Sequence, residues 1–358
     1  KNGIFNAFFS FFYAKFPQFQ IKYHQNHNST FSCQNKETYT SKDFLGPRYL
    51  YTRLKKKKII KKSYYEILNI VEQMRQLKRE SLDIKSSLSN KAFIEKVGKL
   101  IPSIVSADEL FLITEVILKA PVSESIFKKK KDFCKFLIQI ASLKGSELAA
   151  LYIADKKAKS GSHDQLSQAL FIYKTLSMKG NAKASLILGN FAAKLNDDKQ
   201  AENFYLKSIK KENSDAMVAL AVLKKRLGKD AEAKYWFIRA SEMNNAEGHF
   251  GRSLYTSNEE SLYYLLQAAS NGVIEAAHNL GTIYRKQGNI LLSKEWYEVA
   301  AFSGFQVSQM NLARLYEEEG SFDKSLFWAR EAQKQGGNII EEAKEFENAL
   351  LKKCPYLK

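Results

Sequence analysis

Cysteine, proline and long apolar runs are all scarce in this sequence of 358 residues. The three cysteines, Cys33, Cys134 and Cys354, are far apart and odd in number, which excludes a disulfide framework and the usual zinc spacings. With only five prolines, the chain has room for long uninterrupted helices. No apolar run reaches the roughly 18 residues that a membrane-spanning helix needs. We therefore predict an all-α chain whose thiols are buried or incidental in a reducing compartment.

Motifs that carry enzyme chemistry are also missing. The sequence has no glycine-rich phosphate loop, no paired-histidine zinc motif, no nucleophile elbow and no Cys-x-x-Cys. His24 and His27 precede Cys33 in a segment that we predict to be cleaved or disordered. His163 with Asp164 fits a turn and a helix N-cap better than a catalytic pair. We therefore predict that the protein is not an enzyme and holds neither a cofactor nor a metal.

The most informative positive feature is a repeat that begins near residue 144. In one column a large apolar residue precedes a small one, and the small members follow one another at steps of 40, 32, 30, 30 and 32 residues. The pairs are Leu148-Ala149, Leu188-Gly189, Leu220-Ala221, Phe250-Gly251, Leu280-Gly281 and Leu312-Ala313. A fixed period of this length predicts stacked helix pairs, because no single pair can bury its apolar face alone.

The second helix of each unit carries an aromatic residue four positions before an alanine. The pairs are Trp236 with Ala240, Tyr264 with Ala268, Trp296 with Ala300, and Trp328 with Ala332. We interpret the aromatic residue as a buried knob and the alanine as the space that lets the neighbouring helix approach.

A family resemblance is clearest in residues 274–304. Residues 276–284 (AAHNLGTIY) resemble the first-helix signature of tetratricopeptide and Sel1-like repeats, and residues 296–304 (WYEVAAFSG) are more similar to Sel1. The resemblance covers roughly residues 144–337. It implies a right-handed α-α solenoid of about six repeats, which binds a protein partner along its first helices.

Three further regions complete the predicted organisation. Residues 1–62 form a basic, aromatic leader, and residues 63–143 an irregular helical N-terminal region. Residues 338–358 carry a C-terminal capping helix, which an open solenoid needs to cover its last apolar face. The acidic residues predicted for the solvent side of that helix are Glu341, Glu342, Glu345 and Glu347.

Positive charge is concentrated in the leader. Residues 1–62 carry 13 Lys or Arg against two acidic residues, which is +11 of the net charge of +18, whereas residues 146–358 carry 29 against 26. A nearly neutral repeat body makes nucleic acid an unlikely partner, because phosphate binding requires cations. Residues 1–36 contain no acid and many hydroxyl groups, which is typical of a mitochondrial presequence. The alternative interpretation is a secretory signal, since residues 28–30 (Asn-Ser-Thr) form a sequon.

The resemblance also assigns inward positions on the first helices, and these form the predicted peptide-binding surface. They are Lys183, Asn190, Lys194, Lys225, Arg226, Arg252, Tyr255, His278, Thr282, Arg285, Lys286, Met310 and Arg314. Successive units contribute Lys or Arg, which favours an acidic peptide or a C-terminal carboxylate. The alternative is that cations simply prefer helix C-termini, which does not account for Arg252 or Arg314.

The overall layout resembles fungal mitochondrial factors of tetratricopeptide type that help export the C-terminal tail of cytochrome c oxidase subunit 2. This implies a non-enzymatic adaptor or assembly factor, peripheral on the matrix side of the mitochondrial inner membrane, which holds a client segment for the insertion machinery. The lysines of residues 55–62 offer contact with anionic lipid. Two alternatives stay open: a mitochondrial RNA-binding or translation factor, and a Sel1-like adaptor of endoplasmic-reticulum quality control.

Overall fold

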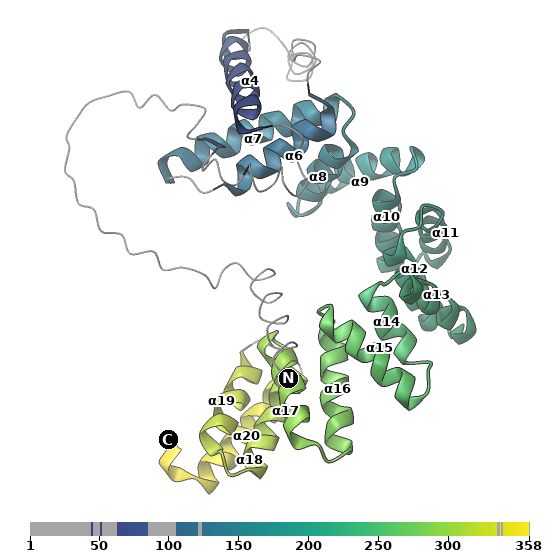
Figure 1. Ribbon diagram of the computed structural model, residues 1–358, viewed down its shortest axis with the longest axis vertical. Helices are drawn as coiled ribbons and strands as arrows, with labels where there is room; N and C mark the ends of the chain where they lie inside the picture. The colour runs from purple at the N-terminus through teal and green to yellow at the C-terminus, as the bar shows by residue number, and fades with distance from the viewer. Residues whose placement is uncertain are drawn as a thin grey trace, which may run out of the picture. The chain divides into compact units, whose positions relative to one another are not determined.

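The computed structural model describes most of the chain after residue 104. The described residues are Phe44, Leu45, Tyr51, 63–84, 105–120, 124–334, 337 and 339–357, with the side chains of 77–84, 124–126 and 357 excepted. The predicted presequence, the sequon and the lysines of residues 55–62 lie outside this part. Within it every regular element is a helix (Figure 1), so the predicted all-α solenoid is confirmed.

The chain divides into two compact units, residues 24–188 and residues 189–358, here called the N-terminal and C-terminal units. In the N-terminal unit one apolar core joins α4, α6, α7 and the start of α8 (Figure 1). Ile67, Ile113 and Ile140 are fully enclosed in it. Ser106 caps α6, because its side chain accepts a hydrogen bond from the backbone N–H of Glu109 at 3.2 Å. The helices are α4 (Tyr64–Ile84), α6 (Ala107–Lys119), α7 (Glu124–Leu143), α8 (Glu147–Ala158), α9 (His163–Met178) and the first half of α10 (Ala182–Lys194).

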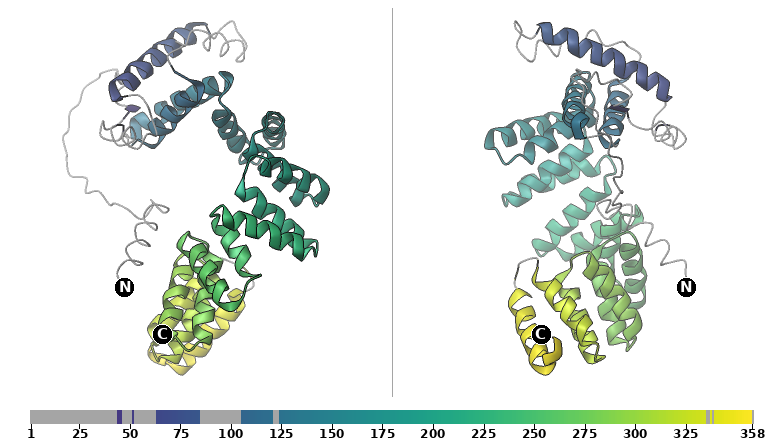
Figure 2. Two further views of the ribbon diagram at one scale, coloured as in Figure 1. Left: turned by 45° about the vertical axis from the view of Figure 1, so that its right-hand side comes forward. Right: turned by 90° about the vertical axis from the view of Figure 1, so that its left-hand side faces the viewer.

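The C-terminal unit is a row of helix pairs in which each helix packs on the next one in sequence (Figure 2). First helices alternate with second helices, and α20 closes the row. After the end of α10, the elements are α11 (Asp198–Ile209), α12 (Ser214–Arg226), α13 (Asp230–Glu242), α14 (Ala246–Ser253), α15 (Asn258–Ser270), α16 (Ile274–Lys286), α17 (Ile290–Phe302), α18 (Gln306–Glu318), α19 (Phe322–Gln333), α20 (Ile339–Lys353) and the 3₁₀ turn η2 (Pro355–Leu357).

The structural repeat is 32 residues long, except in one unit. The first helices α10, α12, α14, α16 and α18 begin at residues 182, 214, 246, 274 and 306, at steps of 32, 32, 28 and 32. The short step falls on α14, which has 8 residues where the others have 13. The sequence alignment of this unit is therefore wrong. Phe250-Gly251 does not occupy the Leu-Gly column, which in α14 falls on Arg252 and Ser253.

The turns show the same interruption. From α9 onward a residue with positive φ recurs every 16 residues, except for one step of 28 from Asn244 to Gly272. A left-handed residue ends one helix and lets the next one turn back. These residues are Gly180, Asn196, Glu212, Gly228, Asn244, Gly272, Gly288, Gly304 and Gly320. Within this described stretch the turn after α14, residues 254–257, is the only one between helices without such a residue.

Close packing between helices depends on glycine in the first helix and a ring in the second. A Cβ atom on Gly189 or Gly281 would come within 2.5 Å of the ring of Tyr205 or Tyr297, respectively. These rings are 3% and 1% exposed. The predicted knobs Trp236, Tyr264 and Trp296 are only partly buried, so that prediction is wrong by one position in three units. The enclosed residues are the next ones along each helix, Phe237, Leu265 and Tyr297, whereas Trp328 is itself buried, as predicted.

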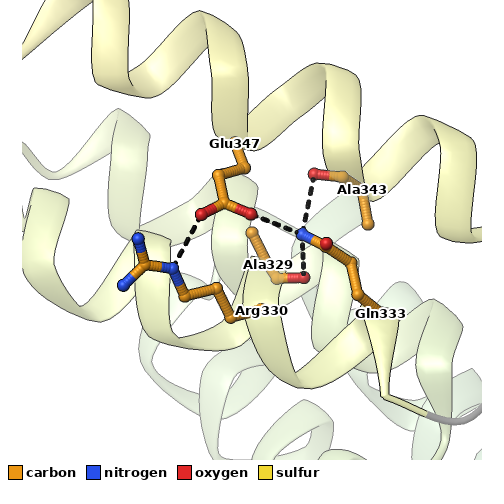
Figure 3. A network of polar contacts seen from close by, with 5 residues as sticks. All are labelled: Ala329, Arg330, Gln333, Ala343 and Glu347. Atoms are coloured by element: carbon orange, nitrogen blue, oxygen red, sulfur yellow. Dashed lines mark hydrogen bonds and ion pairs between the residues drawn. The ribbon is translucent and has the colours of Figure 1, made fainter. Parts of the chain in front are cut away.

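The capping helix α20 covers the last pair through apolar and polar contacts. Met310, Ala332 and Ala343 form one enclosed cluster. Glu347 accepts hydrogen bonds from Arg330 and Gln333, both at 2.7 Å (Figure 3). Burial alone would raise the pKa of Glu347, but these hydrogen bonds and the Arg330 charge lower it. Glu347 therefore belongs to the interface with α19 and not to the solvent side, where the sequence placed it.

Candidate functional site

Three of the predicted binding arginines are neutralised by acidic residues of neighbouring helices. Arg226 pairs with Asp198 of α11, and Arg314 of α18 pairs with Glu342 of α20. The guanidinium of Arg285 lies 2.6 Å from the carboxylate of Glu318. These pairs are at least a third exposed on one side, so each contributes little stability. They nevertheless remove positive charge from the surface that the sequence predicted.

The lysines behave differently. Lys194, Lys225 and Lys286 are exposed near the ends of α10, α12 and α16, and none has an acidic partner among the described residues. Lys183 is likewise exposed, but it lies in the N-terminal unit. Together with Arg252 of α14, four successive first helices thus end in at least one cation without a partner, whereas α18 ends in Glu317 and Glu318.

Most of the remaining predicted residues have partners within the protein. Met310 is 2% exposed, so its prediction as a surface contact is wrong: it fills the space between α18 and α20. Asn190 accepts a hydrogen bond from the hydroxyl of Tyr205 at 2.9 Å. Tyr255 donates to Asp230 at 3.3 Å, and the hydroxyl of Thr282 lies 3.0 Å from that of Tyr297.

Lys224, the neighbour of Lys225, is a buried cation that the sequence analysis did not single out. Its Nζ lies 2.6 Å from Glu202 of α11 and 2.7 Å from Glu232 of α13. Burial alone would lower the pKa of Lys224, but hydrogen bonds to both carboxylates raise it. This lysine therefore connects α12 with α11 and α13. The sequence signal that could have identified it as buried is its position on the packed face of α12, one residue before the exposed Lys225.

Two histidines lie between helices in surroundings that disfavour their charged forms. Nδ1 of His278 lies 2.8 Å from the hydroxyl of Ser308, between the rings of Tyr297 and Phe305. Burial lowers the pKa of His278, and burial together with the charge of Arg252 lowers that of His249.

We expect stability to fall as pH decreases from about 7 towards 5. Below the ordinary histidine pKa of about 6.5 the unfolded chain binds protons that the folded chain resists, so unfolding becomes favoured. Urea unfolding at pH 7.5 and 5.5 measures this effect. The loss of unfolding free energy between pH 7.5 and pH 5.5 should be smaller in His278→Gln than in the wild type. An equal loss in that variant would contradict the assignment to His278.

The described residues contain no group of three or more metal-ligating side chains and no helix long and apolar enough to cross a membrane. What the structure does contain is a row of stacked helix pairs with cations along the ends of its first helices. This defines the fold as an α-solenoid of stacked helix pairs.

Comparison with known proteins agrees with this class. Residues 274–300, which cover α16 and most of α17, match the model of the tetratricopeptide repeat. No curated protein sequence matches the chain. Among solved structures, it is similar to a Sel1 repeat protein from Oxalobacter formigenes, with 16% identity and a TM-score of 0.51 over 88% of this chain and 97% of that one. It is also similar to c5321, a protective antigen of uropathogenic Escherichia coli with an SLR fold, with 16% identity and a TM-score of 0.51 over 73% and 72%. At this identity the similarity concerns the fold alone.

Proposed function

We propose that the protein is a non-enzymatic adaptor that binds an acidic segment of a protein client along its first helices. The observation that carries this proposal is the row of unpartnered cations at the ends of α10, α12, α14 and α16. Repeat solenoids of this class generally bind proteins, and a row of cations favours carboxylates over neutral or basic segments.

We further propose the setting that the layout of the sequence suggests. The basic leader and the short repeats support a place on the matrix side of the mitochondrial inner membrane. The client would then be the C-terminal tail of cytochrome c oxidase subunit 2, or another respiratory subunit that is exported or assembled there.

Site-specific photo-crosslinking tests the binding surface. A photoreactive residue placed at Lys194 or Lys225 should crosslink to a synthetic peptide of the client tail. The same residue at Tyr235, which is 54% exposed on the second helix α13, is the matched control and should not. Crosslinks from Tyr235 alone, or none at all, would overturn the proposed surface.

Protease protection in fractionated mitochondria tests the location. Protection until the inner membrane is broken, with release by alkali, is expected for a peripheral matrix adaptor. Recovery in a secretory or cytosolic fraction would defeat the mitochondrial setting but leave the peptide-binding proposal intact.

A further inference from the structure

The first helices share a leucine at their seventh residue, and α14 departs from this pattern. Leu188, Leu220, Leu280 and Leu312 are each at most 4% exposed. The seventh residue of α14 is Arg252. A guanidinium thus stands in the column that elsewhere supplies the apolar core, in the one unit that has lost four residues.

The surroundings of Arg252 hold its side chain in place without neutralising it. Its guanidinium carbon lies 4.3 Å from the centre of the Tyr264 ring. The ring of Tyr264 in turn stacks on His249, with centres 6.0 Å apart and an interplanar angle of 19°. Nε of Arg252 is enclosed and has no hydrogen-bond acceptor. The terminal nitrogens have no acceptor among the described residues either, and they are not enclosed.

The polar groups around this stack are already engaged. His249 lies 2.8 Å from the hydroxyl of Ser241 and 3.0 Å from the side-chain oxygen of Asn244. Tyr255, three residues after Arg252, donates its hydroxyl hydrogen bond to Asp230. No described carboxylate therefore pairs with Arg252, unlike Arg226, Arg285 and Arg314.

Stability does not explain an arginine at this position. An enclosed donor without a partner destabilises the fold, and leucine would avoid that penalty. Arg252 does lie in the last turn of α14, because this helix ends at Ser253; the sequence interpretation that separated it from a helix end is wrong. However, a cation at a helix C-terminus adds only a small stabilisation, and an exposed lysine would add as much.

We propose that Arg252 is the recognition point for one carboxylate of the acidic client segment. The carboxylate binds end-on to the two terminal nitrogens, because Nε is enclosed. Tyr264 positions the guanidinium by stacking on it. This inference rests on the proposed function and names the residue that gives it specificity for acid.

Arginine modification by phenylglyoxal, read by mass spectrometry on the full chain, tests the proposal. The probes are two fluorescein-labelled decapeptides, one with four glutamates and one with glutamines in their place. Arg252 should react faster than the ion-paired Arg285 and Arg314. The glutamate peptide should slow its reaction at least fivefold, whereas the glutamine peptide should not.

Anisotropy titrations with the same probes supply the matched variants. Arg252→Lys keeps the charge at the helix end but loses the planar fork, so affinity for the glutamate peptide should fall about tenfold with unchanged thermal stability. Arg314→Lys, which alters an ion-paired arginine, should bind as the wild type does. Tyr264→Phe should retain the affinity, and Tyr264→Leu should reduce it.

The outcomes separate this inference from the proposed function. If the glutamate peptide binds but does not protect Arg252, or if Arg252→Lys binds as tightly as the wild type, the inference falls and the adaptor function stands. If neither peptide binds the wild-type chain, both fall.

Discussion

Gly281→Ala should lower the free energy of unfolding by about 3 kcal/mol, at the upper end of the cost of overpacking. The new Cβ would lie 2.5 Å from Cδ1 and 2.7 Å from Cε1 of Tyr297. That ring cannot move aside easily, because it is 1% exposed and its hydroxyl lies 3.0 Å from that of Thr282. Urea unfolding of the full chain, followed by circular dichroism, measures the loss.

The sign of the Gly281 result is diagnostic. In an unobstructed helix, alanine stabilises relative to glycine by about 1 kcal/mol, so a gain in stability would contradict the close packing. The double variant Gly281→Ala with Tyr297→Leu should recover part of the loss, because the smaller side chain makes room for the Cβ.

Removal of α20 should have an effect of similar size. A chain that ends at Lys334 would expose Met310 and Ala332, which Ala343 of α20 covers. It would also leave Arg330 and Gln333 without Glu347 (Figure 3). Exposing one large apolar side chain costs about 1.5–3 kcal/mol. We expect the melting temperature to fall by roughly 10 °C, with aggregation through the exposed end.

Two controls separate the capping role of α20 from a general effect of its residues. Glu341→Ala changes an exposed residue of the same helix and should leave the melting temperature almost unchanged. Ala343→Asp places a charge in the enclosed cluster and should reproduce most of the effect of truncation. A truncated chain that melts at the wild-type temperature would show that α20 is not a cap.

The sequence predicts the architecture well because the packing signal is local. Leu280-Gly281 and Ala300 are fully buried at or near contacts between neighbouring helices, as their spacing indicates. The sequence alignment of the fourth unit is wrong because Phe250-Gly251 has the large-small pattern of the Leu-Gly pairs but lies two residues before the equivalent positions, Arg252 and Ser253. Only the boundaries of α14 show that four residues are missing and that Arg252 stands where leucine is expected.

The electrostatics of the surface could not be predicted from residue types alone. Arg285 and Glu318 are 33 residues apart, and their pairing depends on how one unit is rotated onto the next. Lys224 and Lys225 are adjacent and identical in type, yet one is buried between two carboxylates and the other is exposed. Side-chain direction at a helix edge changes within one residue, so a small error in register reverses the prediction.

The 28-residue unit and the 32-residue units can serve different roles in the stack. In a linear stack each unit contacts mainly its neighbours in sequence, so the energetic effect of an unfavourable residue fades along the array. The 32-residue units on either side can then supply cohesion, while the shortened one accumulates changes that would be too costly in a single globular core. A repeat protein of this kind can acquire a new specificity by altering one module, with no need to redesign the whole.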